Sequence, residues 1–63
     1  MPVVNITMLG GRPPEKKEEL IQRVTDTIAD TLGITIDKVH IVLYEVPKEN
    51  FGHGGIALSK MMP

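Results

Sequence analysis

Cysteine is absent from this sequence of 63 residues, and histidine occurs only twice. The first absence excludes disulfides, and the scarcity of both residue types argues against a structural zinc site. A chain of this length rarely buries enough apolar surface to fold alone, and disulfides, metals or self-association usually complete it. Because the first two are not supported, the sequence predicts a single domain, residues 1–63, that is completed by oligomerisation.

The chain also lacks an excess of charge of either sign, and aromatic residues are scarce. Seven basic and eight acidic residues give a net charge of −1, and there is one Tyr and one Phe. Nucleic-acid binding usually requires a basic surface, so it is not expected. The longest aliphatic and aromatic run, residues 41–44, is far too short to cross a membrane, and the N-terminus has no pattern of a signal peptide. We therefore expect a cytoplasmic protein that binds neither nucleic acid nor membrane.

Three segments have the patterns of regular secondary structure. Residues 3–9, VVNITML, are rich in β-branched side chains and predict a strand. Residues 14–32 predict a helix, because Pro14 suits the first helical position and Gly33 suits the C-terminal cap. Residues 39–46, VHIVLYEV, are nearly all apolar and predict a strand that is covered on both faces. The helix has an apolar stripe that consists of Leu20, Ile21, Val24, Ile28 and Leu32.

Strand, helix and strand of these lengths predict an α/β fold, a single right-handed βαβ unit with two parallel strands and one long helix on one face. The glycine-rich residues 51–55 lead into residues 56–58, which predict a short C-terminal hairpin or edge strand. Both edges and one face of the sheet remain open, and open edges invite pairing with another chain. A second copy could extend the sheet to four strands, and further copies could bury the remaining face.

The second residue is a proline, and its chemistry depends on the residue before it. If Met1 is removed, Pro2 has a secondary amine, whereas a retained Met1 makes its nitrogen a non-basic amide. An α-amine has a pKa near about 8, and desolvation or a nearby cation lowers the pKa toward the range suited to a general base. Pro2 begins an apolar strand and is therefore a candidate base. The alternative is a proline without a catalytic role.

Four other residues are candidates for a binding site. Arg12 lies in the predicted loop after the first strand, at the sheet edge where βαβ folds bind ligands, and arginine can bind a carboxylate with two hydrogen bonds. Phe51 lies beside glycines that allow a ligand to approach the backbone closely. His40 and His53 do not have the spacing of metal ligands. The alternatives are that Arg12 is a solvated loop residue and that Phe51 fills a small core. For the histidines, they are that His40 lies at an interface and that His53 is a loop residue.

Taken together, these features resemble the 4-oxalocrotonate tautomerase family over essentially the whole chain. The resemblance rests on Pro2, the Gly11–Arg12 turn, the lengths of the elements, and Phe51-Gly52-His53-Gly54-Gly55. It implies a homohexamer, a trimer of dimers, with active sites formed between neighbouring subunits. It also implies a cofactor-independent tautomerase, an isomerase that moves protons in small unsaturated 2-hydroxy or 2-oxo acids.

The resemblance also implies a role for each candidate residue. Pro2 would be the general base, and Arg12 would bind and polarise a carboxylate of the substrate. Phe51 would belong to a hydrophobic wall that lowers the pKa of the amine. Backbone groups near Leu9 and His53 would lie along the same substrate-binding pocket.

The chain departs from the family pattern at two positions of this pocket. His40 replaces a second arginine, which ordinarily binds the far end of a dicarboxylate, and His53 replaces an aliphatic residue. Histidine cannot form the two-pronged contact of arginine. We therefore expect monocarboxylate enols, such as phenylenolpyruvate, to be handled relatively better than the dicarboxylate 2-hydroxymuconate.

Two other functions are compatible with the same residues. One is a hydratase or dehalogenase of the same superfamily, in which a carboxylate activates water. Glu45 and Glu49 are the nearest candidates, but no pattern fixes their position. The other is a non-enzymatic oligomeric ligand-binding protein that retains Met1.

Overall fold

The computed structural model describes residues 1–62. Its elements, in chain order, are β1 (Val3–Leu9), α1 (Pro14–Leu32), η1 (Ile36–Lys38), β2 (His40–Val46), η2 (Lys48–Asn50), β3 (Gly52–His53), β4 (Ile56–Ala57) and α2 (Leu58–Met61). The predicted bounds of the first strand and the helix are confirmed. The second strand begins at His40 instead of Val39, because the Val39 N–H donates to the Ile36 carbonyl (3.1 Å) and closes the short helix η1.

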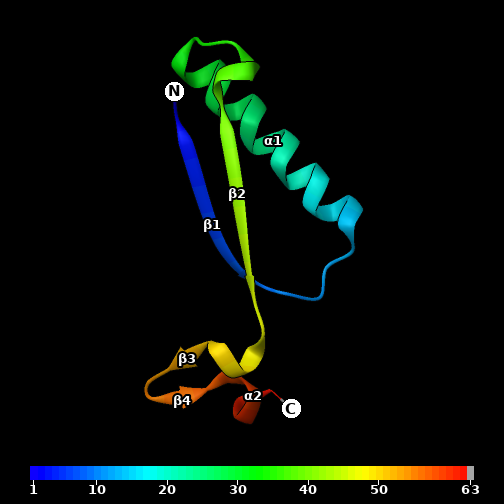
Figure 1. The fold of residues 1–63 in the computed structure, drawn as a ribbon, viewed down its shortest axis with the longest axis vertical. Helices are drawn as coiled ribbons and strands as arrows, with labels where there is room; N and C mark the ends of the chain where they lie inside the picture. The colour runs from blue at the N-terminus through cyan, green and yellow to red at the C-terminus, as the bar shows by residue number, and fades with distance from the viewer. Residues whose placement is uncertain (63) are drawn as a thin grey trace.

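The two long strands pair in parallel, and α1 crosses one face of the sheet they form (Figure 1). The register joins Val3 to His40 at one end and Leu9 to Val46 at the other. The ladder is extended at both ends, because the His40 N–H donates to the Pro2 carbonyl (3.0 Å) and the Gly10 N–H donates to the Val46 carbonyl (3.1 Å). The predicted α/β architecture, one βαβ unit with parallel strands, is therefore confirmed.

Local sequence signals determine where α1 begins and ends. Pro14 occupies the first turn, where its missing N–H leaves no hydrogen bond unmade. Gly33 ends the helix with a φ of 68°, in the left-handed region that glycine adopts without strain. The N–H groups of Gly33 and Ile34 both donate to the Ala29 carbonyl. The chain can thus turn sharply and return toward the start of β1.

The apolar stripe of α1 is only partly covered. Leu20, Val24 and Ile28 are half-buried, but Ile21 is exposed and Leu32 is 59% exposed. A sheet of two strands is too narrow to cover the whole stripe, so residues on its flanks stay at the surface. Ala29, which the pattern did not single out, is the one buried hydrophobic residue in the described part of the chain, at 5% exposed.

The opposite face of the sheet is open. Side chains alternate along a strand, so those of β2 that point away from α1 are uncovered. Val42 is 37% exposed and Tyr44 is 52% exposed, and Val3 on β1 is also exposed. The prediction that the second strand is covered on both faces is therefore wrong for a single chain. This side of the sheet, opposite α1, is the open face.

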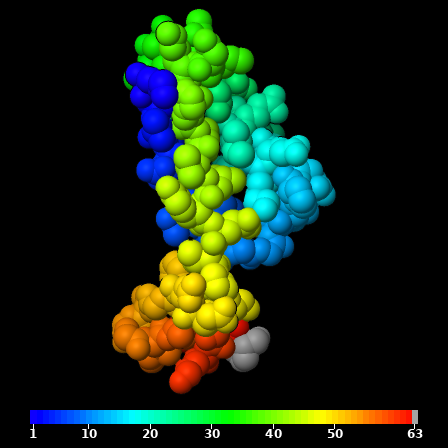
Figure 2. Space-filling model, in the orientation of Figure 1, coloured from blue at the N-terminus to red at the C-terminus, as the bar shows by residue number. Residues whose placement is uncertain are grey.

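Residues 48–62, here called the C-terminal arm, extend beyond the ends of β1 and β2 (Figures 1 and 2). Strands β3 and β4 form the predicted hairpin around Gly54 and Gly55, whose φ values of 61° and 87° suit a tight two-residue turn. Leu58 was expected in the last strand, but it begins α2, and its N–H donates to the Phe51 carbonyl (2.7 Å). Within residues 1–62, no helix is long and apolar enough to span a membrane.

Candidate active site

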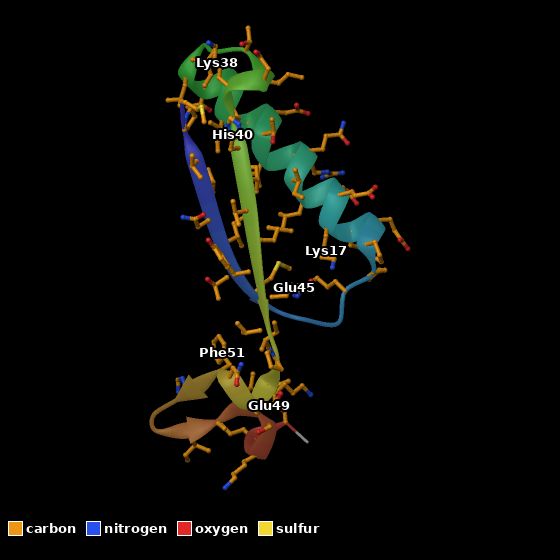
Figure 3. The ribbon with its side chains drawn as sticks, in the orientation of Figure 1. Lys17, Lys38, His40, Glu45, Glu49 and Phe51 are labelled. Carbon is orange, nitrogen blue, oxygen red and sulfur yellow. The ribbon has the colours of Figure 1, made fainter. Side chains whose placement is uncertain are left out.

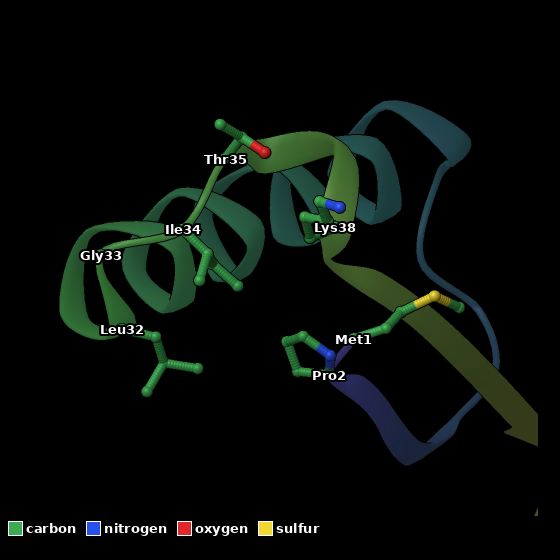
Figure 4. A pocket seen from close by; sticks show the side chains of 7 residues that line it. All are labelled: Met1, Pro2, Leu32, Gly33, Ile34, Thr35 and Lys38. Carbon is green, nitrogen blue, oxygen red and sulfur yellow. The ribbon is translucent and has the colours of Figure 1, made fainter.

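Pro2 lies beside an open cavity at the N-terminal end of β1, here called its first end. The cavity has a volume of about 510 Å³, and Figure 4 shows the side chains around it. It is lined by Met1, Pro2, Leu32, Gly33, Ile34, Thr35 and Lys38. Pro2 is half-buried, whereas Met1 is almost entirely exposed. The N-terminus thus meets the end of α1 and the turn that leads to β2.

Lys38 is the one residue with a charged side chain among the described residues that line this cavity. The sequence reasoning did not identify it. The parallel register pairs Val3 with His40, so the segment before β2 lies beside the segment before β1. Lys38 therefore comes close to Pro2 through strand pairing, although the two residues are far apart in sequence.

His40 lies near Pro2 through its backbone, but its side chain belongs to the other side of the sheet. It pairs with Val3 on the open face, and both residues are exposed. Pro2 precedes Val3 and lies on the side of the sheet that α1 covers, beside Leu32. The single chain therefore does not direct His40 into the Pro2 cavity.

Leu9 and Arg12 lie at the C-terminal end of β1, here called its second end. Leu9 is roughly 23 Å from Pro2, because the strand rises about 3.3 Å per residue. The Arg12 guanidinium donates to the Leu9 carbonyl (3.0 Å) and remains exposed. Arg12 also lines a second cavity of about 480 Å³, together with Met8, Lys16 and Leu20.

An ion pair fastens the helix to β2 near Arg12. The Lys17 ammonium donates to the Glu45 carboxylate at 2.7 Å, and the two side chains are only 28% and 32% exposed. Figure 3 shows Lys17, from α1, and Glu45, from β2, facing each other between the helix and the strand. Glu45 is thus paired, and Glu49 lies in the C-terminal arm, so neither carboxylate is placed beside Pro2.

Phe51 and His53 lie in the C-terminal arm, at the opposite end of the molecule from the N-terminus (Figures 1 and 3). Phe51 is 40% exposed, so it does not fill a core within its own chain. The predicted site residues therefore form three groups in one chain, with Pro2 and His40 in the first, Leu9 and Arg12 in the second, and Phe51 and His53 in the third. One chain does not bring them together.

Two further observations concern groups that could bind an anion or a metal ion. Arg23 pairs with Glu19 at 2.9 Å on the exposed side of α1. Within residues 1–62, no three His, Asp or Glu side chains gather in a way that could hold a metal ion.

Comparison with known proteins gives a consistent classification. Residues 2–61 match the family model described as tautomerase enzyme. The chain is 38% identical over 61 residues to the 2-hydroxymuconate tautomerase of Pseudomonas putida. The matched residues cover 97% of each protein. A crystal structure of a 4-oxalocrotonate tautomerase homologue matches with a TM-score of 0.88 and 42% identity, over 94% of both chains. A heterohexameric 4-oxalocrotonate tautomerase from Chloroflexus aurantiacus matches with a TM-score of 0.90 and 31% identity, over 97% of this chain and 98% of that one.

The chain belongs to the tautomerase family. The match covers nearly its whole length, and the predicted family resemblance is confirmed. Its relatives support tautomerase activity, which makes the protein an isomerase.

Proposed function

We propose that this protein catalyses keto–enol proton transfer in small unsaturated 2-hydroxy or 2-oxo acids, with the Pro2 amine as general base. The observation that carries the proposal is the position of Pro2 on a largely apolar, open cavity, which has a volume of about 510 Å³ while Met1 is present and helps to line it. An α-amine has a pKa near about 8, and an apolar environment disfavours its protonated form. This environment favours a neutral amine near pH 7, as a general base requires.

In the proposed reaction the proton moves and the overall charge does not change. The Pro2 nitrogen removes the proton of the 2-hydroxy group, and the electrons left on oxygen form the carbonyl. The double bonds shift, and a carbon of the substrate takes the proton back from the Pro2 ammonium. Arg12 binds a carboxylate with two hydrogen bonds and draws electron density toward it. The reaction needs no cofactor.

Pro2 and Arg12 of one chain lie too far apart to act on the same small molecule. We propose that the active site forms between subunits of a homohexamer, a trimer of dimers. Antiparallel pairing of β1 with β1 of a second copy would form a four-stranded sheet and bring Pro2 of one chain toward Leu9 and Arg12 of the other. The hexameric relative supports such an assembly.

The exposed apolar residues also support self-association. In residues 1–62 they are Met1, Val3, Ile21, Leu32, Ile36, Val42, Tyr44, Phe51, Ile56, Met61 and Met62. The open face of the sheet would pack in the interior of the hexamer. The C-terminal arm would cover a neighbour and carry Phe51 and His53 to its substrate pocket.

The test compares protein with and without Met1, verified by mass spectrometry, on phenylenolpyruvate and 2-hydroxymuconate. We expect the processed protein to isomerise at least one of these acids. Protein that retains Met1 should lose about 10²- to 10⁴-fold in kcat/KM, because its Pro2 nitrogen is an amide. Size-exclusion chromatography of both forms serves as the control for assembly.

Two results would contradict the proposal. If the processed protein is inactive on both acids, a ligand-binding role without catalysis becomes the better interpretation. Equal activity of the two forms would exclude Pro2 as the base.

A further inference from the structure

The cavity beside Pro2 contains an ammonium group that the proposed reaction does not yet use. Figure 4 shows Lys38 and Pro2 at the same cavity, Lys38 from η1 and Pro2 from the segment directly before β1. Lys38 is placed by its backbone, because its N–H donates to the Thr35 carbonyl (3.1 Å) and the next residue closes η1. Its position is therefore a property of the fold.

Lys38 differs from most other cationic residues of the chain. Arg12, Lys16, Lys17, Arg23 and Lys48 each form an ion pair or donate a hydrogen bond through their side chains. Within residues 1–62, only Lys38 and Lys60 form neither, and Lys60 lines neither of the two cavities described above. An unpaired ammonium at a largely apolar cavity is available to an anionic ligand.

The two candidate anion-binding groups lie on opposite sides of the proposed intersubunit site. Arg12 of one chain would approach from the second end of β1, and Lys38 of the other chain borders Pro2 itself. A substrate held between them would meet one cation at each end. A cavity of about 510 Å³ is in the range that binds small organic molecules.

We propose that Lys38 binds the second carboxylate of a dicarboxylate enol acid, at the end of the substrate nearest Pro2. This inference rests on the proposed function, in which Pro2 is the base and Arg12 binds the first carboxylate. Lys38 supplies the cation that His40 does not. The monocarboxylate preference expected from His40 should therefore be small in the native protein and become large when Lys38 is removed.

The experiment uses the full chain with a verified Pro2 terminus and three variants. Lys38→Met removes the charge and keeps most of the length, Lys38→Arg keeps the charge, and Lys60→Met is the matched control on the C-terminal arm. For Lys38→Met we expect kcat/KM on 2-hydroxymuconate to fall about tenfold to a hundredfold, mainly through KM. The rate on phenylenolpyruvate should change little, because this acid has only one carboxylate. Lys38→Arg should retain most of the dicarboxylate activity, and Lys60→Met should resemble the native protein.

The outcomes separate this inference from the proposed function. An active native protein whose Lys38→Met variant keeps its activity on 2-hydroxymuconate would overturn the inference alone. An equal loss on both acids would also overturn it, since Lys38 would then act on Pro2 or on the fold. A Lys38→Arg variant that folds but has no higher kcat/KM on 2-hydroxymuconate than Lys38→Met would also overturn the inference. A processed native protein that is inactive on both acids would overturn the proposed function and the inference with it.

Discussion

The two ends of β1 have different surroundings. At the first end, Pro2 borders a largely apolar cavity, and the Lys38 ammonium forms no ion pair within residues 1–62. At the second end the charged groups are engaged, because Arg12 donates to the Leu9 carbonyl and Lys17 contacts a carboxylate at 2.7 Å. The first end offers a largely apolar lining and a cation without an ion pair among the described residues, whereas at the second end Arg12 and Lys17 are hydrogen-bonded to neighbouring groups.

In the proposed assembly, this difference would divide the catalytic groups between two chains. A proton-transfer base benefits from an apolar environment, and a carboxylate-binding arginine benefits from a loop that is held in place. Neither end alone contains both. The proposed active site is complete only where the first end of one chain meets the second end of another, and the following predictions test this comparison.

The largest effect is expected from a charge on the open face, because both ends depend on the proposed assembly. Val42→Asp would bury a carboxylate without a partner, which costs several kcal/mol. We expect loss of the oligomer, of folded structure and of activity, measured by size-exclusion chromatography, circular dichroism and rate assays. Thr31→Asp, on the exposed side of α1, is the control and should remain assembled. A folded and active Val42→Asp oligomer would show that the open face is not an interface.

A mixing experiment tests directly whether the two ends meet between chains. Protein that retains Met1 lacks a functional first end, and the Arg12→Ala variant lacks a functional second end. After the two are unfolded and refolded together, mixed sites should combine the intact end of each. We expect the mixture to be more active than the sum of the two proteins refolded separately. Activity equal to that sum would mean that each site is formed by a single chain.

A smaller effect is expected when a cation is introduced at position 40, whose side chain lies on the open face and can reach a substrate only in a site formed with a neighbouring chain. In the Lys38→Met background, His40→Arg should raise kcat/KM on 2-hydroxymuconate by about tenfold to a hundredfold, because the second carboxylate regains a charged hydrogen bond. In the native background the gain should be smaller, since Lys38 is already present. Kinetics on both enol acids measure the effect. No gain in either background would exclude position 40 as a carboxylate-binding position in this chain.

The smallest effect is expected at the second end, from the ion pair between Lys17 and Glu45. Lys17→Met or Glu45→Gln should each lower the free energy of unfolding by about 1 kcal/mol, because the pair is partly shielded from water. Chemical denaturation in a double-mutant cycle would measure the coupling. Lys16→Met is the matched control, since its pair with Glu19 is longer, at 3.5 Å, and more exposed. A coupling of zero would mean that this pair does not fasten α1 to β2.

Much of the fold could be predicted from the sequence because its signals are local. The β-branched run fixed the bounds of β1, and Pro14 and Gly33 marked the bounds of α1. The start of β2 was one residue off, because η1 closes on Val39 through a hydrogen bond that has no clear local signal. The exposure of Leu32 depends on the width of the sheet, which periodicity along a helix does not reveal.

The candidate site was predictable in a different way. Pro2, Arg12 and Phe51 could be named from the family resemblance, but their separation in one chain required the structure. Lys38 was missed because its position beside Pro2 follows from the parallel register. That register relates two segments of the chain more than thirty residues apart.

The isolation of Ala29 as the one buried hydrophobic residue of the described chain has a consequence for the protein in solution. If most apolar burial occurs between copies, folding and association form one equilibrium that obeys mass action. The midpoint of thermal unfolding should then rise with protein concentration. Strong dilution should remove activity more steeply than in proportion to the amount of protein.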